Sequence, residues 1–249
     1  MFITVSPESV GISSEKISAY YKMLEKNRFN VHSIVMAKGN KIFTEMYKKP
    51  FNANTVHRMY SETKSFVGIA VAQLAADRKI SLDDKIVDYF PDKLPPDLSP
   101  YIKMQTIRHM LTMQTFTTGI GWLGQNVTDR LKHYFSLRAE KCPGTVFHYD
   151  SEGSFVLGAL IERVTGMTFL DYLRQKCLDK IGFSKEARCL KTPDGYAWSD
   201  SALLCTTRDM LLFGRLIANE GKWNNVKSSH SIGFNNSDDI ESVSTEQIT

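Results

Sequence analysis

One segment of this chain is apolar on nearly every side of the helix that it would form. Between residues 62 and 77 apolar side chains cover most of the circumference of an α-helix: Phe66, Ile69, Ala70, Ala72, Leu74 and Ala75. Such a helix cannot lie on a surface, because water would meet apolar groups whichever face turned outward. The sequence therefore predicts a helix in the middle of a domain, with other elements packed around it.

The composition fits one large core. The chain has 249 residues, of which 42% are apolar and 23% charged, and this excludes a disordered chain, a collagen-like fibre and a small disulfide-stapled scaffold. Its 31 basic and 27 acidic residues are scattered, so we expect no nucleic-acid partner. The longest nearly apolar run, 66–76, is shorter than the ~20 residues that span a bilayer. No charged start leads into an apolar segment, so we expect a cytoplasmic protein without a membrane partner.

Cysteine and histidine spacing gives no sign of a metal site. The four cysteines, at positions 142, 177, 189 and 205, form no C-x-x-C pair, and buried free thiols are favoured over disulfides or metal ligands. The six histidines do not cluster at ligand spacing. We expect neither a metal nor another cofactor.

Periodicity and turn residues define the other elements. Residues 13–16 can cap a helix that continues with apolar positions three and four apart. Residues 31–37 and 41–47 flank a short Gly-containing loop and predict a β-hairpin. After a proline-rich connection at 91–100, shorter helical patterns follow at 107–113, 127–136, 155–164, 169–177 and 207–219.

This pattern predicts one domain over residues 1–224. Residues 1–60 would supply a helix and the hairpin of a sheet, and residues 61–224 a mostly helical lobe with the active site. Residues 225–249 are rich in Ser, Asn, Asp and Glu and are expected to be a poorly packed polar tail.

Ser61 and Lys64 form an S-x-x-K pattern at the start of the central helix. A hydroxyl is a poor nucleophile at neutral pH and requires a base within hydrogen-bond reach, and positions i and i+3 share a helix face. The pattern is weak alone, since Ser13 and Lys16 repeat it. We assign Ser13 to helix capping, whereas for Ser61 capping and catalysis both remain open.

Tyr149 is the second candidate base. It lies on a loop before a helical pattern, and Ser151, two residues later, could orient the lysine or the substrate. Tyr134 and Ser136 repeat this spacing within a helical pattern and are expected to pack. A structural role is also open for Tyr149, because most tyrosines are amphipathic core residues. His148, beside it, is expected to be structural.

Five blocks, taken in order, resemble the serine β-lactamase and penicillin-recognising hydrolase family. They are residues 60–66, 79–91, 106–113, 143–158 and 205–210. The branch that they resemble contains class C β-lactamases, D-alanyl-D-alanine carboxypeptidases and related esterases. The resemblance covers about residues 10 to 224 and implies a mixed α and β fold, in which an antiparallel sheet is flanked by helices. It also implies a nucleophilic Ser61 activated by Lys64 and Tyr149, an acyl-enzyme intermediate, and no cofactor.

Two departures from the family pattern affect the expected activity. Ser151 stands where β-lactamases most often carry asparagine, which favours an esterase or peptidase-like member. The family's third motif, K-T-G or H-x-G on a C-terminal strand, is not found; residues 230–233 have the wrong spacing. Because the motif is not found, we expect a C-terminally truncated fold. That strand supplies one of the two oxyanion donors in the family, so we also expect a weak or inactive hydrolase. Self-association would then occur through an open edge flanked by Ile34, Met36, Ile42 and Phe43.

Two functions follow from these features. The first is a serine hydrolase that cleaves an amide or ester of a small-molecule or peptide-like substrate, with Ser61, Lys64 and Tyr149 in a cleft between the two lobes and Ser151 at the substrate. The second is a non-catalytic member that binds peptide-like or acyl ligands without turnover.

Overall fold

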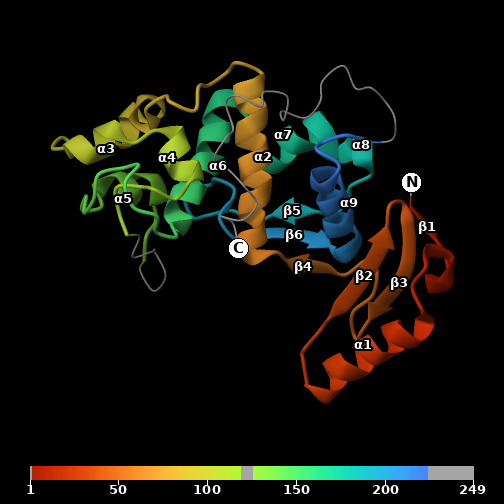
Figure 1. Cartoon of the computed structure of the whole chain (residues 1–249). Coiled ribbons are helices and arrows are strands. Elements are labelled where there is room, and N and C mark those ends of the chain that lie inside the picture. Colours follow the sequence, from red (N-terminus) through yellow and green to blue (C-terminus); the bar gives the residue numbers. More distant parts are fainter. Residues whose placement is uncertain (1, 119–125, 224–249) are drawn as a thin grey trace.

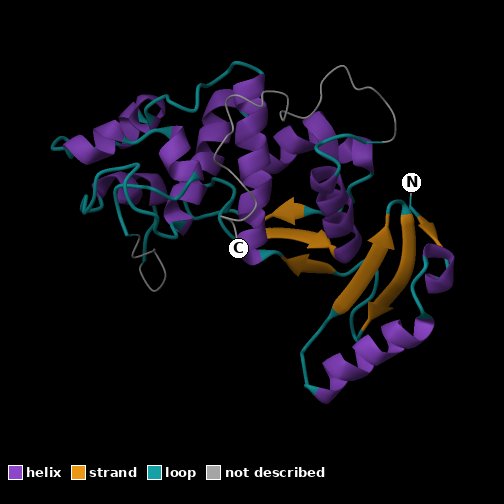
Figure 2. Ribbon diagram, viewed as in Figure 1, coloured by secondary structure: helices purple, strands orange, loops and turns teal. Residues whose placement is uncertain are grey.

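The computed structural model describes residues 2–118 and 126–223. Its strands form two small three-stranded sheets, and most of its helices gather in one lobe (Figure 2). The mixed α and β class predicted from the sequence is confirmed by this arrangement and by the related structures reported below.

The N-terminal sheet lies at one side of the molecule with α1 packed beside it (Figure 1). Strands β2 (Ser33–Lys38) and β3 (Lys41–Tyr47) form the predicted hairpin, and β1 (Ile3–Thr4) pairs with β3 in parallel, so the strand order is β1-β3-β2. The sheet is therefore not wholly antiparallel. Helix α1 (Ser14–Lys26) begins where expected, because the Ser13 hydroxyl accepts a hydrogen bond from the Glu15 N–H.

The apolar segment forms α2 (Thr63–Ala76), which stands at the centre of the helical lobe (Figure 1). Its inward side chains are at most 1% exposed: Phe66, Val67, Ala70, Val71 and Leu74. Helices α6 (Ser151–Thr165) and α7 (Phe169–Leu173) contact it. The prediction of a central buried helix is confirmed.

A second sheet brings together strands that are distant in the chain, and no sequence pattern predicted it. Strand β6 (Leu203–Thr206) pairs antiparallel with β4 (Val56–Arg58) and with β5 (Arg188–Cys189). Helix α9 (Thr207–Ala218) follows β6 directly, after a capping box in which the Thr206 and Asp209 side chains each bond the other residue's backbone N–H. Strand β4 leads in turn to the start of α2, so this sheet anchors the segment that carries Ser61.

The remaining elements are short and occupy the connections. They are α3 (Pro100–Met104), α4 (Ile107–Leu111), α5 (Arg130–Ser136), α8 (Asp179–Ile181), the 3₁₀ turns Pro7–Val10, Tyr60–Glu62, Ile86–Tyr89 and Pro91–Lys93, and the π-helical turn Arg174–Leu178.

The expectation about the open sheet edge needs correction, and the expectation about the tail lies outside the described residues. Ile42 and Phe43 do not flank an open edge, because they belong to the central strand β3 and are buried. Among the described strands, β2 is paired on one side only. The predicted tail at 225–249, with residues 230–233, lies outside the described residues.

Over the part of the chain that the structure describes, no single helix is long and apolar enough to cross a membrane. One bent pair, Ser151–Thr165 with Phe169–Ile181, meets the criteria of length and composition.

Candidate active site

Ser61 lies on an exposed turn between the second sheet and the central helix. Strand β4 ends at Arg58, residues Tyr60–Glu62 form a 3₁₀ turn, and α2 begins at Thr63. Ser61 therefore precedes the α-helix by one 3₁₀ turn instead of lying in its first turn. Tyr60 has a φ of 48°, a left-handed conformation that is rare for residues with a side chain. This backbone turn presents the Ser61 hydroxyl at the surface.

Lys64 contacts both Ser61 and a distant backbone carbonyl. Its Nζ donates to Ser61 Oγ at 3.1 Å and to the Asp200 carbonyl oxygen at 2.7 Å. Asp200 precedes β6, and its side chain is buried, which raises the pKa of its carboxyl group above the usual range. Two acceptors therefore fix the amine beside the serine.

Tyr149 completes the group from a different part of the chain. Its Oη donates to Ser61 Oγ at 2.7 Å, and Lys64 Nζ lies 5.0 Å from the centroid of its ring. The structure thus brings Ser61, Lys64 and Tyr149 together. Lys64 Nζ and Tyr149 Oη both lie within hydrogen-bond distance of Ser61 Oγ.

The loop before Tyr149 is held by backbone hydrogen bonds. The Gly144 N–H donates to the Gln114 carbonyl at 2.8 Å, and the His148 N–H donates to the Met113 carbonyl at 3.0 Å. After Tyr149 the chain enters α6, where the Asp150 side chain caps the helix by accepting from the Gly153 N–H at 2.9 Å. Tyr149 is therefore fixed on both sides.

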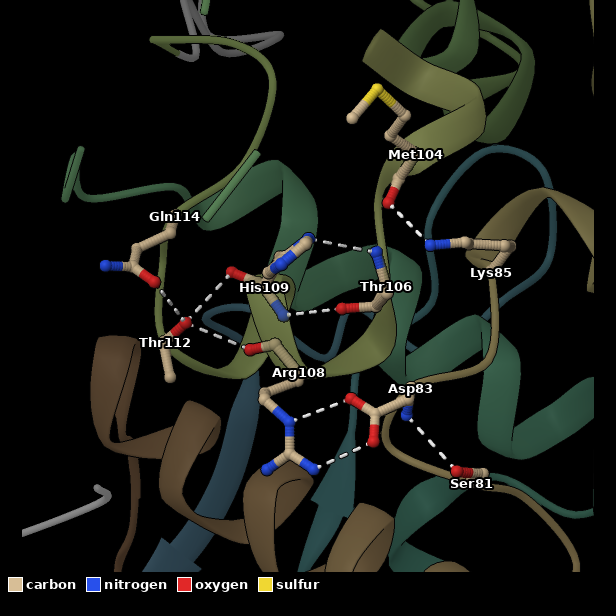
Figure 3. A network of polar contacts seen from close by, with 9 residues as sticks. All are labelled: Ser81, Asp83, Lys85, Met104, Thr106, Arg108, His109, Thr112 and Gln114. Atoms are coloured by element: carbon tan, nitrogen blue, oxygen red, sulfur yellow. Dashed lines mark hydrogen bonds and ion pairs between the residues drawn. The ribbon is translucent and has the colours of Figure 1, made fainter. Parts of the chain in front are cut away.

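A polar network surrounds α4 and the turn after it (Figure 3). The Thr106 N–H donates to His109 Nδ1 at 3.3 Å, and the His109 N–H donates to Thr106 Oγ1 at 3.2 Å. Thr112 Oγ1 donates to the Arg108 carbonyl at 3.0 Å and lies 3.3 Å from Gln114 Oε1. These contacts define the turn whose carbonyls bind the Tyr149 loop.

Gly144 packs directly on the His109 ring. Its φ is +82°, and a Cβ added there would lie 2.8 Å from His109 Nε2. Burial lowers the pKa of the His109 imidazole, which favours the neutral ring, whose unprotonated Nδ1 accepts from the Thr106 N–H. The sequence analysis gave His109 no role, and the structure makes it a support of the Tyr149 loop.

The other residues singled out in the sequence lie away from the hydrogen bonds that join Ser61, Lys64 and Tyr149. Ser151 is the first residue of α6 and half-buried, and within the described residues no hydrogen bond joins it to Ser61, Lys64 or Tyr149. Tyr134 is fully buried in α5 and accepts from Gln105 Nε2 at 2.9 Å, so its predicted packing role is confirmed. His148 is exposed, with Nδ1 3.2 Å from the Tyr149 carbonyl.

Exposed apolar side chains lie on the two segments that carry Ser61 and Tyr149. Tyr60 is 63% exposed, and Val146 and Phe147 in the Tyr149 loop are each 57% exposed. Two cavities, of about 350 and 430 Å³, are lined by other parts of the chain, one near β1 and α9 and the other near α5. The described cavities do not contain Ser61, so the expected cleft between two lobes is not one of them.

All four cysteines are free thiols. Over residues 2–118 and 126–223, no group of three or more His, Cys, Asp or Glu side chains is arranged to hold a metal ion.

Comparison with known proteins gives the family of this chain. The β-lactamase family model matches residues 22–239, most of the chain, and the protein belongs to the β-lactamase family. The match continues beyond position 224, where the resemblance was expected to end.

Its relatives include hydrolases of several kinds. The chain is 22% identical to the 6-aminohexanoate-dimer hydrolase of Paenarthrobacter ureafaciens over 76% of its own length and 52% of that protein's. It is 30% identical to the esterase EstB of Burkholderia gladioli over 47% of this chain and 34% of the esterase. The octameric penicillin-binding protein homologue from Pyrococcus abyssi shares the fold, with a TM-score of 0.66, 19% identity, and coverage of 85% of this chain and 57% of that one. The chain thus spans about half the length of the first of these relatives.

Proposed function

We propose that this protein is a serine hydrolase that cleaves an ester or amide through an acyl-enzyme on Ser61. The observation that carries the proposal is that Ser61 Oγ lies within hydrogen-bond distance of both Lys64 Nζ, at 3.1 Å, and Tyr149 Oη, at 2.7 Å. A serine flanked by two groups able to take its proton is the arrangement that nucleophilic catalysis requires. The hydrolase and esterase among its relatives support this class of reaction.

The proposed acylation starts with Tyr149 as base. Tyr149 first gives its own proton to solvent, and the Ser61 hydroxyl, whose hydrogen rotates freely, then donates to the Tyr149 oxygen. Ser61 Oγ then attacks the carbonyl carbon as its proton passes to Tyr149, and the ammonium group of Lys64 stabilises the negative charge. When the tetrahedral intermediate collapses, the bond to the leaving group breaks and the leaving oxygen or nitrogen takes the proton. Water completes the reaction by the reverse sequence of proton transfers, which releases the acid and restores the Ser61 hydroxyl.

We propose an acyl group with apolar character. The exposed side chains of Tyr60, Val146 and Phe147 lie on the two loops that carry Ser61 and Tyr149. No metal or organic cofactor enters the proposed steps.

The test is covalent labelling followed by turnover. A fluorophosphonate probe and a fluorescent penicillin should each add their acyl or phosphonyl mass to the intact protein, and Ser61→Ala should abolish the addition. p-Nitrophenyl acetate and nitrocefin then measure turnover. Labelling that persists in Ser61→Ala contradicts the nucleophile, and reversible binding without a mass shift supports the alternative of a non-catalytic binder.

A further inference from the structure

The nucleophile segment, residues 58–64, is joined to one turn, residues 198–203, by several hydrogen bonds. The Met59 N–H donates to the Leu203 carbonyl at 2.8 Å, and the Leu203 N–H donates to Thr63 Oγ1 at 3.2 Å. Lys64 Nζ donates to the Asp200 carbonyl at 2.7 Å. The position of Lys64 beside Ser61 therefore depends on where this turn places its backbone.

The Arg58 side chain also joins the two segments. Its Nε donates to the Ser201 carbonyl at 2.9 Å, and its Nη2 donates to Ser201 Oγ at 3.3 Å. Its Cζ also lies 4.9 Å from the ring centroid of Trp198 and 4.9 Å from that of Tyr60. The Arg58 guanidinium thus contacts Trp198 and Ser201, which lie before and after Asp200 in the chain. It also contacts Tyr60, which precedes Ser61.

Tyr60 needs such support because its conformation is unfavourable. Its φ of 48° lies in the left-handed region, which strains a residue with a Cβ. Its side chain is 63% exposed, so burial contributes little to holding it in place. The Arg58 guanidinium against the Tyr60 ring favours the conformation that turns Ser61 toward Lys64 and Tyr149.

An arginine is required for these contacts together. Its planar group donates hydrogen bonds in its plane while its faces remain available to aromatic rings. A lysine at position 58 would keep the charge and could reach one acceptor, but it could not donate from two fixed nitrogens and stack as well.

We propose that Arg58 is a positioning residue for the active site, holding the turn whose Asp200 carbonyl fixes Lys64 Nζ beside Ser61 and holding Tyr60 in its left-handed conformation. This inference rests on the function proposed above, because it gives Arg58 its effect through Lys64 and Ser61. Arg58 touches neither Ser61 nor the substrate in this role.

Two variants, Arg58→Ala and Arg58→Lys, test the proposal against a matched control. Arg163 makes a similar set of contacts at a distant site, with two hydrogen bonds of 2.8 Å to Asp92 and its Cζ 5.1 Å from the Phe90 ring centroid. Both Arg58 variants should lower kcat for p-nitrophenyl acetate about tenfold to a hundredfold with little change in KM, because the reacting groups are misplaced while the binding surface remains. Arg163→Lys should lower only the melting temperature.

An NMR measurement reports on the surroundings of Lys64 whether or not Ser61 is acylated. In protein labelled with ¹³C at lysine Cε, the Lys64 signal is assigned by its absence in Lys64→Ala. It should be displaced by the nearby Tyr149 ring in the wild type and in Arg163→Lys, and should move toward the bulk lysine signals in both Arg58 variants.

The outcomes separate this proposal from the proposed function. A wild-type chain that no probe acylates contradicts the proposed function. The shift of the Lys64 signal in the Arg58 variants then tests by itself whether Arg58 positions Lys64. If Arg58→Ala does not fold, the rate and the Lys64 signal of Arg58→Lys test the proposal. An Arg58→Lys protein with a wild-type rate, or one with a reduced rate and an unmoved Lys64 signal, overturns the proposal.

Discussion

Tyr149 Oη donates a hydrogen bond of 2.7 Å to Ser61 Oγ, although 88 residues separate them in the chain. Ser61 lies in the 3₁₀ turn that leads into α2 and Tyr149 immediately precedes the α6 cap, and these two helices pack against each other (Figure 1). The contact between the two side chains is therefore a consequence of how the central helices pair. Rigid helices on both sides give the site a fixed geometry.

Lys64 and Tyr149 are expected to act as one unit. Lys64→Ala and Tyr149→Phe should each slow fluorophosphonate labelling of Ser61 by about 10²–10⁴, and the double variant should be scarcely slower than the worse single variant. Intact mass measured against time gives the rates. Tyr101→Phe, at an exposed tyrosine elsewhere, is the control. Fully multiplicative losses would show that the two groups act independently.

Gly144→Ala should reduce both stability and labelling. The added Cβ requires a left-handed φ, at about 1 kcal/mol, and also meets His109 Nε2 at 2.8 Å. Gly11→Ala is the matched control, because Gly11 has a similar φ of +79° and nothing within 4 Å of the added atom. Urea unfolding should show the larger loss for Gly144→Ala, and only that variant should label slowly. Equal effects of the two substitutions would exclude a role for the His109 contact.

Acid should destabilise the fold through three half-buried histidines. Burial lowers the pKa of His109, and likewise of His57 and His133, below the ordinary value near 6.5. The unfolded chain then binds more protons than the folded chain below about pH 6.5, so the free energy of unfolding decreases as pH falls through and below that value. Protonation of His109 at Nδ1 would also remove the acceptor of the Thr106 N–H.

His109→Asn tests this contribution, since an Asn Oδ1 can accept from the Thr106 N–H without titrating. Urea unfolding between pH 5 and 8 should show a shallower dependence on pH in the variant than in the wild type. An unchanged slope would assign the acid sensitivity to other groups.

The sequence predicted elements whose signals are local. The all-round apolar pattern required a central α2, and Ser13 with the following periodicity located α1. The hairpin followed from alternation around a Gly-containing loop. Each of these depends on residues within one turn or one hairpin, where periodicity and capping act directly.

Contacts made by backbone atoms could not be predicted from the sequence. The second sheet joins strands of two to four residues that are distant in the chain, too short for alternation to be read. The Asp200 carbonyl that binds Lys64 is a group that every residue carries, so no residue type marks it. Arg58 and Trp198 were missed for the same reason, since their roles depend on the turn between them.

Within residues 2–118 and 126–223, no strand pairs with β2 on the side away from β3, and we expect this edge to promote self-association. The Lys48 N–H donates to the His32 carbonyl at 2.9 Å, which makes these two residues a hydrogen-bonded pair at the end of the β2–β3 ladder. Hydrogen-bonded and non-hydrogen-bonded pairs alternate in an antiparallel ladder, so the register places the N–H groups of Ser33 and Val35 on the side away from β3. An edge with unpaired N–H and C=O groups is a template for another strand.

Val35→Pro removes one outward N–H and should weaken this association, while Val35→Ala, which keeps the N–H, should not. Proline is tolerated at such a position because the donor that it lacks is not used within the sheet. Sedimentation velocity over a range of protein concentrations should show the wild type and Val35→Ala shifting to larger species together, with Val35→Pro remaining closer to the monomer. A wild-type chain that stays monomeric at every concentration would show that the edge is covered, and the fold would then need no second copy to protect β2.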